Sequence, residues 1–121
     1  MRFLGVDFGE KKIGLAISEG FLAEPLGTVK KIAAVQRICR EQGIDKIVIG
    51  LSESEMAEKT RRFGANLRQL TGLPVVYQDE TLTSEEAKKI MVKSGKSKKK
   101  RQQQSDTIAA CLILQDYLDS D

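Results

Sequence analysis

The first eighteen residues constrain the fold more than any other stretch of the chain. Two short apolar runs, Phe3–Phe8 and Ile13–Ile17, flank the polar stretch Gly9-Glu10-Lys11-Lys12. Both runs are rich in branched and aromatic residues and are bounded by turn residues, so each predicts a strand and the pair predicts a hairpin. The remaining elements are predicted to assemble around this hairpin.

An aspartate interrupts the first of these strands. Side chains alternate between the two faces of a strand, so Asp7 shares a face with Phe3 and Gly5. A carboxylate is costly to bury unless it is paired or binds a metal. Gly5 and Gly9 leave space beside Asp7, and glycines in strands mark close approach by a ligand or by another backbone. The alternative is an Asx-type turn at Asp-Phe-Gly, with no functional role.

The rest of the chain alternates between strand and helix patterns. A third strand over residues 23–29 contains Pro25, which indicates either an edge strand or the start of a strand. The spacing of apolar residues and the stop signals predict the elements that follow. They are a helix over 32–42, a buried strand over 46–51, a helix from Ser52 to about Thr71, a strand over 74–78, a helix from the capping box Thr83-Ser84-Glu85-Glu86 to about Val92, and a helix from Ser105-Asp106 to about Leu118.

This order predicts an α/β fold. The first three strands favour an antiparallel meander, and the later strand–helix alternation favours parallel strands with right-handed crossovers. We therefore expect a mixed five-stranded sheet with helices on both faces. The length of 121 residues suits a single domain, and no linker divides residues 1–121.

The absence of histidine narrows the chemistry that the chain can perform. With no histidine, it has neither Ser-His nor Cys-His nucleophilic machinery, and no imidazole metal ligand. Cys39 and Cys111 lack metal-site spacing and are interpreted as core thiols in a reducing cytoplasm. Any metal ligands are then carboxylates, which suit Mg²⁺ or Mn²⁺.

Acidic residues recur at predicted element ends where a cleft can form. They are Asp7, Asp79 with Glu80 after the last strand, and Asp106 in the first turn of the last helix. Ligands of open α/β sheets bind outside the carboxyl ends of strands, at a switch in strand order. The acidic residues also have structural explanations, such as a solvated loop at Asp79-Glu80 and a helix-dipole partner in Asp106. Together, however, they match a site in which two divalent ions activate water against a phosphodiester.

Positive charge is concentrated just before Asp106. Residues 88–101 include eight basic side chains and no acid, whereas the rest of the chain has an acidic excess. Such a segment predicts a polyanion partner, although it is also compatible with a solvated loop. Residues 93–104 contain no apolar side chain and are expected to be mobile when free. The candidate nucleic-acid contacts are Lys11, Lys12, Lys96, Lys98, Lys99, Lys100 and Arg101. The few aromatic residues form no stacking ladder, which disfavours a single-strand binder.

No segment suggests a membrane or an export signal. No apolar stretch approaches the roughly 18 residues of a membrane helix. The N-terminus is strand-like and contains an aspartate, unlike a signal peptide. We expect a cytoplasmic protein with no membrane partner, either a monomer or a weak homodimer.

In its motifs the sequence resembles the YqgF/RuvX family, described as Holliday-junction-resolvase-like proteins and as pre-16S ribosomal RNA nucleases. The resemblance covers essentially the whole chain. Its blocks, in family order, are Gly5-Val6-Asp7-Phe8-Gly9, Lys11-Lys12-Ile13-Gly14-Leu15-Ala16, Glu24-Pro25-Leu26, Ile49-Gly50-Leu51, Asp79-Glu80-Thr81-Leu82-Thr83 and the run from Asp106 to Leu118.

The resemblance implies a ribonuclease-H-like fold and a bacterial nuclease that trims the 5′ end of precursor 16S ribosomal RNA, with branched DNA as a further substrate class. It implies that Asp7, Glu80 and Asp106 are both the catalytic and the metal-binding residues. Whether Asp79 or Glu80 faces the site stays open, and the longer reach of Glu80 favours it. The chain departs from the family pattern at Glu10, usually Thr, and at Thr81, usually Arg.

Two other functions are alternatives to a nuclease. The first is a non-catalytic nucleic-acid-binding factor in ribosome assembly or transcription, built on the same fold. The second is a phosphotransferase of the actin and sugar-kinase type, which needs two such domains around its nucleotide. A chain of this length supplies only one.

Overall fold

The structure is a computed structural model that describes residues 1–52, 54–79 and 98–120, with the backbone alone described for 98–106. The predicted helix over residues 83–92 therefore lies outside the described residues. The elements, in chain order, are β1 (Phe3–Phe8), β2 (Ile13–Ser18), β3 (Glu24–Val29), α1 (Ile32–Glu41), β4 (Lys46–Leu51), α2 (Ala57–Thr71), β5 (Val75–Asp79) and α4 (Lys98–Asp119).

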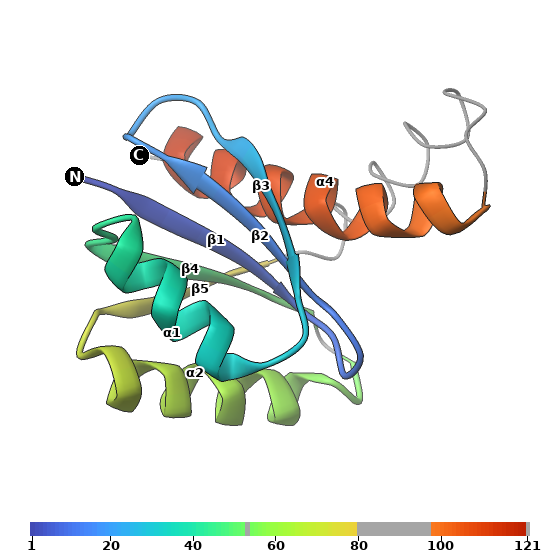
Figure 1. Cartoon of the computed structure of the whole chain (residues 1–121), viewed down its shortest axis with the longest axis horizontal. Helices are drawn as coiled ribbons and strands as arrows, with labels where there is room; N and C mark the ends of the chain where they lie inside the picture. Colours follow the sequence, from blue (N-terminus) through green and yellow to red (C-terminus); the bar gives the residue numbers. More distant parts are fainter. Residues whose placement is uncertain (53, 80–97, 121) are drawn as a thin grey trace.

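The sheet has the predicted mixed topology (Figure 1). Its strand order is β3-β2-β1-β4-β5. The pairs β1–β2 and β2–β3 are antiparallel, whereas β1–β4 and β4–β5 are parallel. Thus β1 lies at the switch in strand order, with its hairpin partner on one side and a parallel strand on the other. Pro25 lies in the edge strand β3, as its missing backbone donor requires.

Helices cover both faces of the sheet, as predicted, and each face has its own apolar core. On one face, α1 and α2 pack on β-strand residues such as Leu4, Val6 and Ile49. On the other face, α4 packs Ala110, Ile113 and Leu114 against Ala16 and Val48. The alternation of β1 therefore directs its even-numbered residues toward α1 and α2, and Phe3, Gly5 and Asp7 toward α4.

Two helices begin elsewhere than predicted. Helix α2 starts at Ala57 rather than Ser52, because Ser54 forms a turn in which its hydroxyl accepts a hydrogen bond from the Met56 amide at 3.2 Å. It is capped by Gly72, as expected, where φ is +71°. Helix α4 starts at Lys98 rather than Ser105.

The early start of α4 corrects the prediction of a mobile segment for residues 98–104. That prediction rested on the absence of apolar residues, but Lys, Arg and Gln are good helix formers. Extending a helix that is already anchored by packing is also far easier than nucleating one. Figure 1 shows the resulting first half of α4 projecting beyond the sheet.

Both cysteines are free thiols; Cys39 is buried in one apolar core, as predicted, and Cys111 is half-buried against the other. Burial raises the pKa of each thiol to about 11.

None of the helices among the described residues is long and apolar enough to cross a membrane.

The raised thiol pKa values predict slow alkylation of the folded protein. At pH 8, a pKa of about 11 instead of 9 lowers the thiolate fraction about 100-fold, and the thiolate is the reactive form. Iodoacetamide should therefore modify Cys39 and Cys111 at least tenfold more slowly in the folded chain than in urea, as measured by mass spectrometry. Equal rates in the two states would contradict this assignment of both thiols to the cores.

Candidate active site

Asp7 lies inside β1, half-buried, and not in the turn that follows. It pairs with Gly14 of β2 within the ladder. The backbone at Asp7 is thus that of a strand, so a tight Asp-Phe-Gly turn does not account for this carboxylate. Its position next to the carboxyl end of β1, at the switch in strand order, is where ligands of α/β sheets bind.

Helix α4 crosses the same face of β1 at very close range. The Phe3 and Tyr117 ring centroids are 6.2 Å apart. A Cβ placed on Gly5 would lie 2.7 Å from the Leu114 Cβ and 2.8 Å from the Ala110 carbonyl oxygen. Gly5 therefore makes room for the helix backbone, and the chain itself fills the space that the sequence analysis assigned to a ligand or another backbone.

These contacts set the register between β1 and α4. Phe3 contacts Tyr117 of α4, and Gly5, two residues later on β1, contacts Leu114 and Ala110, which lie earlier on α4. The two elements therefore run in opposite directions. The next step, from Gly5 to Asp7, is about 6.6 Å along the strand and equals about four residues of helix. The α4 backbone opposite Asp7 is therefore one turn before Ala110, where position 106 lies.

The longer helix also changes the interpretation of Asp106. Because α4 starts at Lys98, position 106 is more than two turns inside the helix. The interaction of a carboxylate with the helix dipole fades beyond the first turn. The predicted place of Asp106 in the first turn is thus wrong, and the dipole explanation for this residue is removed.

The remaining acidic candidates, Asp79 and Glu80, are separated by the alternation of β5. Along β5, Val76 packs with α4 and Gln78 donates a hydrogen bond to Asp116 of α4 at 2.8 Å. Tyr77 instead lies over α2, where its hydroxyl is 3.4 Å from the Arg61 carbonyl oxygen. By alternation Asp79 shares the α2 face with Tyr77, opposite to the face of Asp7. Glu80 lies outside the described residues.

The hairpin turn beside Asp7 is tied to α2. Lys59 of α2 donates a hydrogen bond to the Glu10 carboxylate, and the two form an exposed ion pair. This bond and the Lys59 charge lower the pKa of Glu10. Below the turn, the rings of Phe8 and Phe63 stack with centroids 4.5 Å apart. The turn that presents Lys11 and Lys12 is thereby fixed, and Glu10 is engaged by a cation of the chain itself.

The donor set fits a hard divalent cation. The candidate ligands are all carboxylates, which suit Mg²⁺ or Mn²⁺, and the chain has no histidine to favour zinc. Among the side chains that the structure describes, no group of three His, Cys, Asp or Glu is close enough to hold a metal. Glu80 and the side chain of Asp106 are not among those described side chains.

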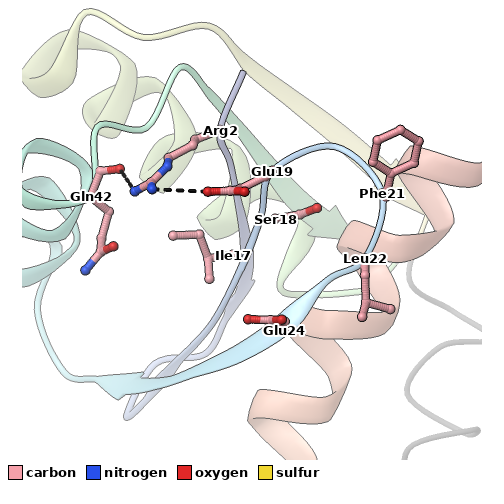
Figure 2. Close-up of a pocket in the computed structure, with 8 residues that line it drawn as sticks. All are labelled: Arg2, Ile17, Ser18, Glu19, Phe21, Leu22, Glu24 and Gln42. Atoms are coloured by element: carbon pink, nitrogen blue, oxygen red, sulfur yellow. Dashed lines mark hydrogen bonds and ion pairs between the residues drawn. The ribbon is translucent and has the colours of Figure 1, made fainter.

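A hollow of about 480 Å³ lies at the end of the sheet opposite to Asp7 (Figure 2). No sequence pattern indicated it. The Arg2 guanidinium spans it, donating hydrogen bonds to the Gln42 carbonyl at 2.8 Å and to Glu19 at 3.2 Å. Phe21 stands at its rim, 91% exposed. The hollow lies near the start of β1, whereas Asp7 lies near the end, so it is separate from the candidate site.

The family model and the related sequences that match this chain agree on one family. A family model described as "RuvX: Holliday junction resolvase" matches residues 1–120. A protein of Agathobacter rectalis named "Putative pre-16S rRNA nuclease" is 38% identical, covering 98% of this chain and 95% of its own length. A protein of Syntrophus aciditrophicus with the same name is 40% identical, covering 99% and 89%.

Comparison with solved structures supports the fold. The fowlpox virus Holliday junction resolvase superposes with a TM-score of 0.63 at 14% identity, over 99% of both chains. Thermus thermophilus RuvC in complex with a Holliday junction substrate gives a TM-score of 0.53 at 13% identity, over 90% of this chain and 91% of that one. The predicted ribonuclease-H-like architecture is thereby confirmed.

Proposed function

The chain belongs to the RuvX Holliday junction resolvase family of nucleases, and from this premise we propose that it hydrolyses phosphodiester bonds near the 5′ end of precursor 16S ribosomal RNA. Branched DNA is the second substrate class, since the RuvC structure holds such a junction. The observation that supports a nuclease centre most directly is the register of α4 on β1, which brings position 106 opposite Asp7. The free thiols fit a bacterial cytoplasm.

In this proposal Asp7, Glu80 and Asp106 hold Mg²⁺ or Mn²⁺ beside the scissile phosphate. A bound ion supplies water activation and stabilisation of the leaving oxygen. The chain positions Asp7 and Asp106 on two rigid elements, because β1 is inside the sheet and α4 is packed on it through Gly5. The placement of Asp79 on the α2 face supports Glu80 as the third ligand.

The basic start of α4 supplies the substrate grip in this proposal. Lys98, Lys99, Lys100 and Arg101 belong to the same helix as Asp106. At a rise of 1.5 Å per residue they precede it by about 8–12 Å, or two to four nucleotide steps of about 3.4 Å. The first turn of α4 has no acidic residue. A phosphate bound there would offset the unfavourable placement of cations at a helix N-terminus.

The test of the function is cleavage of a transcript that includes the 5′ precursor segment of 16S rRNA. We expect defined 5′ cuts with Mg²⁺ or Mn²⁺ and none with EDTA. A four-way DNA junction assayed in parallel decides between RNA and DNA as the preferred substrate. Tight binding without cleavage of either substrate, whatever the metal, would refute the nuclease and favour the non-catalytic assembly factor.

Neutralising the basic start of α4 should lower the affinity for nucleic acid and make that affinity depend less steeply on salt. Changing Lys98, Lys99, Lys100 and Arg101 to Gln keeps good helix formers while removing four charges. The slope of log K against log salt should then decrease by about 0.9 for each duplex phosphate that is no longer neutralised. Fluorescence anisotropy in a KCl series measures it. As a control, Arg37→Gln with Arg62→Gln removes cations that pair with Glu41 and Glu58; an equal slope change there would contradict a specific role for α4.

A further inference from the structure

Tyr77 on the edge strand β5 is the starting point. Its ring lies across α2, with the hydroxyl donating a hydrogen bond to the Arg61 carbonyl oxygen at 3.4 Å. The ring fits against α2 only because residue 64 is glycine: a Cβ there would collide with the Tyr77 hydroxyl and would lie 3.0 Å from its Cζ. The Tyr77 residue is nevertheless 39% exposed, so part of it is available to a partner.

Two arginines of α2 lie beside Gly64, where the Tyr77 ring packs. Arg61 is three residues before Gly64, and Arg68 is four residues after it. At 100° per residue, both arginines lie on the same side of Gly64, about 40–60° away from it around the helix axis. The core residues Phe63 and Leu67 lie on the other side of Gly64. Both arginines are exposed, and neither forms an ion pair within the described part of the chain. Arg62, by contrast, pairs with Glu58 at 2.8 Å.

The surface formed by Tyr77, Arg61 and Arg68 lies on the α2 side of the edge strand β5, whereas the candidate active site lies on the α4 side of β1. Strand β5 ends at Asp79 and the chain continues directly to Glu80, while α2 begins at the same end of the sheet (Figure 1). Helix α2 contains four basic side chains and one acidic side chain. Arg61 and Arg68 are about 10 Å apart along the helix, which is about three stacked nucleotides of 3.4 Å.

The combination of an exposed ring and two exposed guanidinium groups fits unpaired nucleotides. Every base has a face that stacks on an aromatic ring, and arginines neutralise the phosphates on either side. A peptide strand added to the β5 edge would use backbone hydrogen bonds and alternate side-chain pockets, and would leave the two arginines without a role. The positive charge therefore favours nucleic acid over a peptide.

Resting on the nuclease function above, we propose that the surface formed by Tyr77, Arg61 and Arg68 holds a single-stranded segment of about three nucleotides that continues from the cleaved strand around the β5 edge of the sheet. One base stacks on Tyr77, and the flanking phosphates bind Arg61 and Arg68. The enzyme thereby prefers a duplex or junction that has an unpaired arm. Sequence reasoning missed this surface because Tyr77 is far from both arginines along the chain.

The test is binding in EDTA, so that cleavage plays no part. Fluorescence anisotropy compares a blunt RNA duplex with the same duplex bearing a single-stranded overhang. We expect the wild-type chain to bind the overhang form at least tenfold more tightly. Tyr77→Thr, which keeps a good strand former, should lose about tenfold on the overhang form and nothing on the blunt form. Arg61→Gln with Arg68→Gln should reduce the salt slope for the overhang by about 1.4.

Matched controls separate this surface from general effects. Tyr77→Phe keeps the ring and loses only the hydroxyl, so it should bind as the wild type does. Arg62→Gln with Arg37→Gln removes the same charge elsewhere and should leave the overhang preference intact. The proposal fails if the wild type binds both duplexes equally, if Tyr77→Phe loses as much as Tyr77→Thr, or if the two arginine pairs behave alike. An overhang preference without cleavage in Mg²⁺ would refute the nuclease while upholding this surface.

Discussion

Replacing Asp7 with Asn should lower the single-turnover cleavage rate about 10³-fold. The change removes one negative charge from the proposed ligand set at the carboxyl end of β1, and ligand charge is what would hold a hard cation there. Metal-assisted stabilisation of phosphodiester cleavage amounts to several kcal/mol, and each 1.4 kcal/mol is a factor of about ten. Binding measured in EDTA should change little, because Asn has the same shape and the proposed phosphate contacts are at the basic start of α4.

Glu10→Gln is the matched control for Asp7→Asn. Both substitutions neutralise a carboxylate at the same end of β1, but Glu10 is exposed and paired with Lys59. We expect cleavage within a few-fold of wild type for Glu10→Gln. The assignment of Asp7 fails if Asp7→Asn cleaves at the wild-type rate. If the two variants lose activity equally, the loss reflects the general charge of the turn and not the ligand set.

Replacing Gly5 with Ala should destabilise the fold by about 3 kcal/mol, the upper range for overpacking a core. The added methyl group would meet the Leu114 Cβ at 2.7 Å and the Ala110 carbonyl oxygen at 2.8 Å. Neither atom can rotate away, so α4 must move off β1. For a chain of this size the melting temperature should fall by about 10 °C. Cleavage should fall further than stability alone explains, because the movement separates position 106 from Asp7.

Two further variants define the cause of the Gly5→Ala effect. Adding Leu114→Ala to Gly5→Ala should not restore stability, since alanine keeps the offending Cβ. Gly72→Ala tests a glycine that has open space around it but a φ of +71°. It should cost about 1–2 kcal/mol through backbone strain and leave the activity of the folded protein unchanged. An unchanged melting temperature for Gly5→Ala would contradict the close packing of α4 on β1.

The outline of the fold was predictable because it depends on local patterns. Short apolar runs bounded by turn residues located β1 and β2, and a continuous apolar run located β4. The glycine at position 72 located the end of α2. The start of α4 was missed, since a segment without apolar residues was interpreted as a mobile loop. Helix propensity and continuation from a packed helix decided that segment instead.

The candidate site was only partly predictable. The sequence predicted Asp7 as a candidate ligand and predicted its face of the strand, and at Gly5 it predicted close approach by a ligand or another backbone without deciding between them. In the structure, Gly5 is the contact point between β1 and α4. The ambiguity between Asp79 and Glu80 was likewise beyond sequence reasoning. The contacts of Tyr77 with α2 and of Gln78 with α4 placed Asp79 on the face away from Asp7.

The sequence by itself determined the chemistry that this protein has available. A chain without histidine lacks Ser-His and Cys-His machinery and imidazole metal ligands, and its carboxylates at element ends and concentrated basic segment favour metal-assisted or binding roles toward polyanions. Only the tertiary structure decided which residues meet, because that depends on the register of α4 on β1 and on the face that each β5 residue occupies. Both are set by long-range packing at Gly5 and Gly64, where the missing side chains admit a helix backbone and a tyrosine ring.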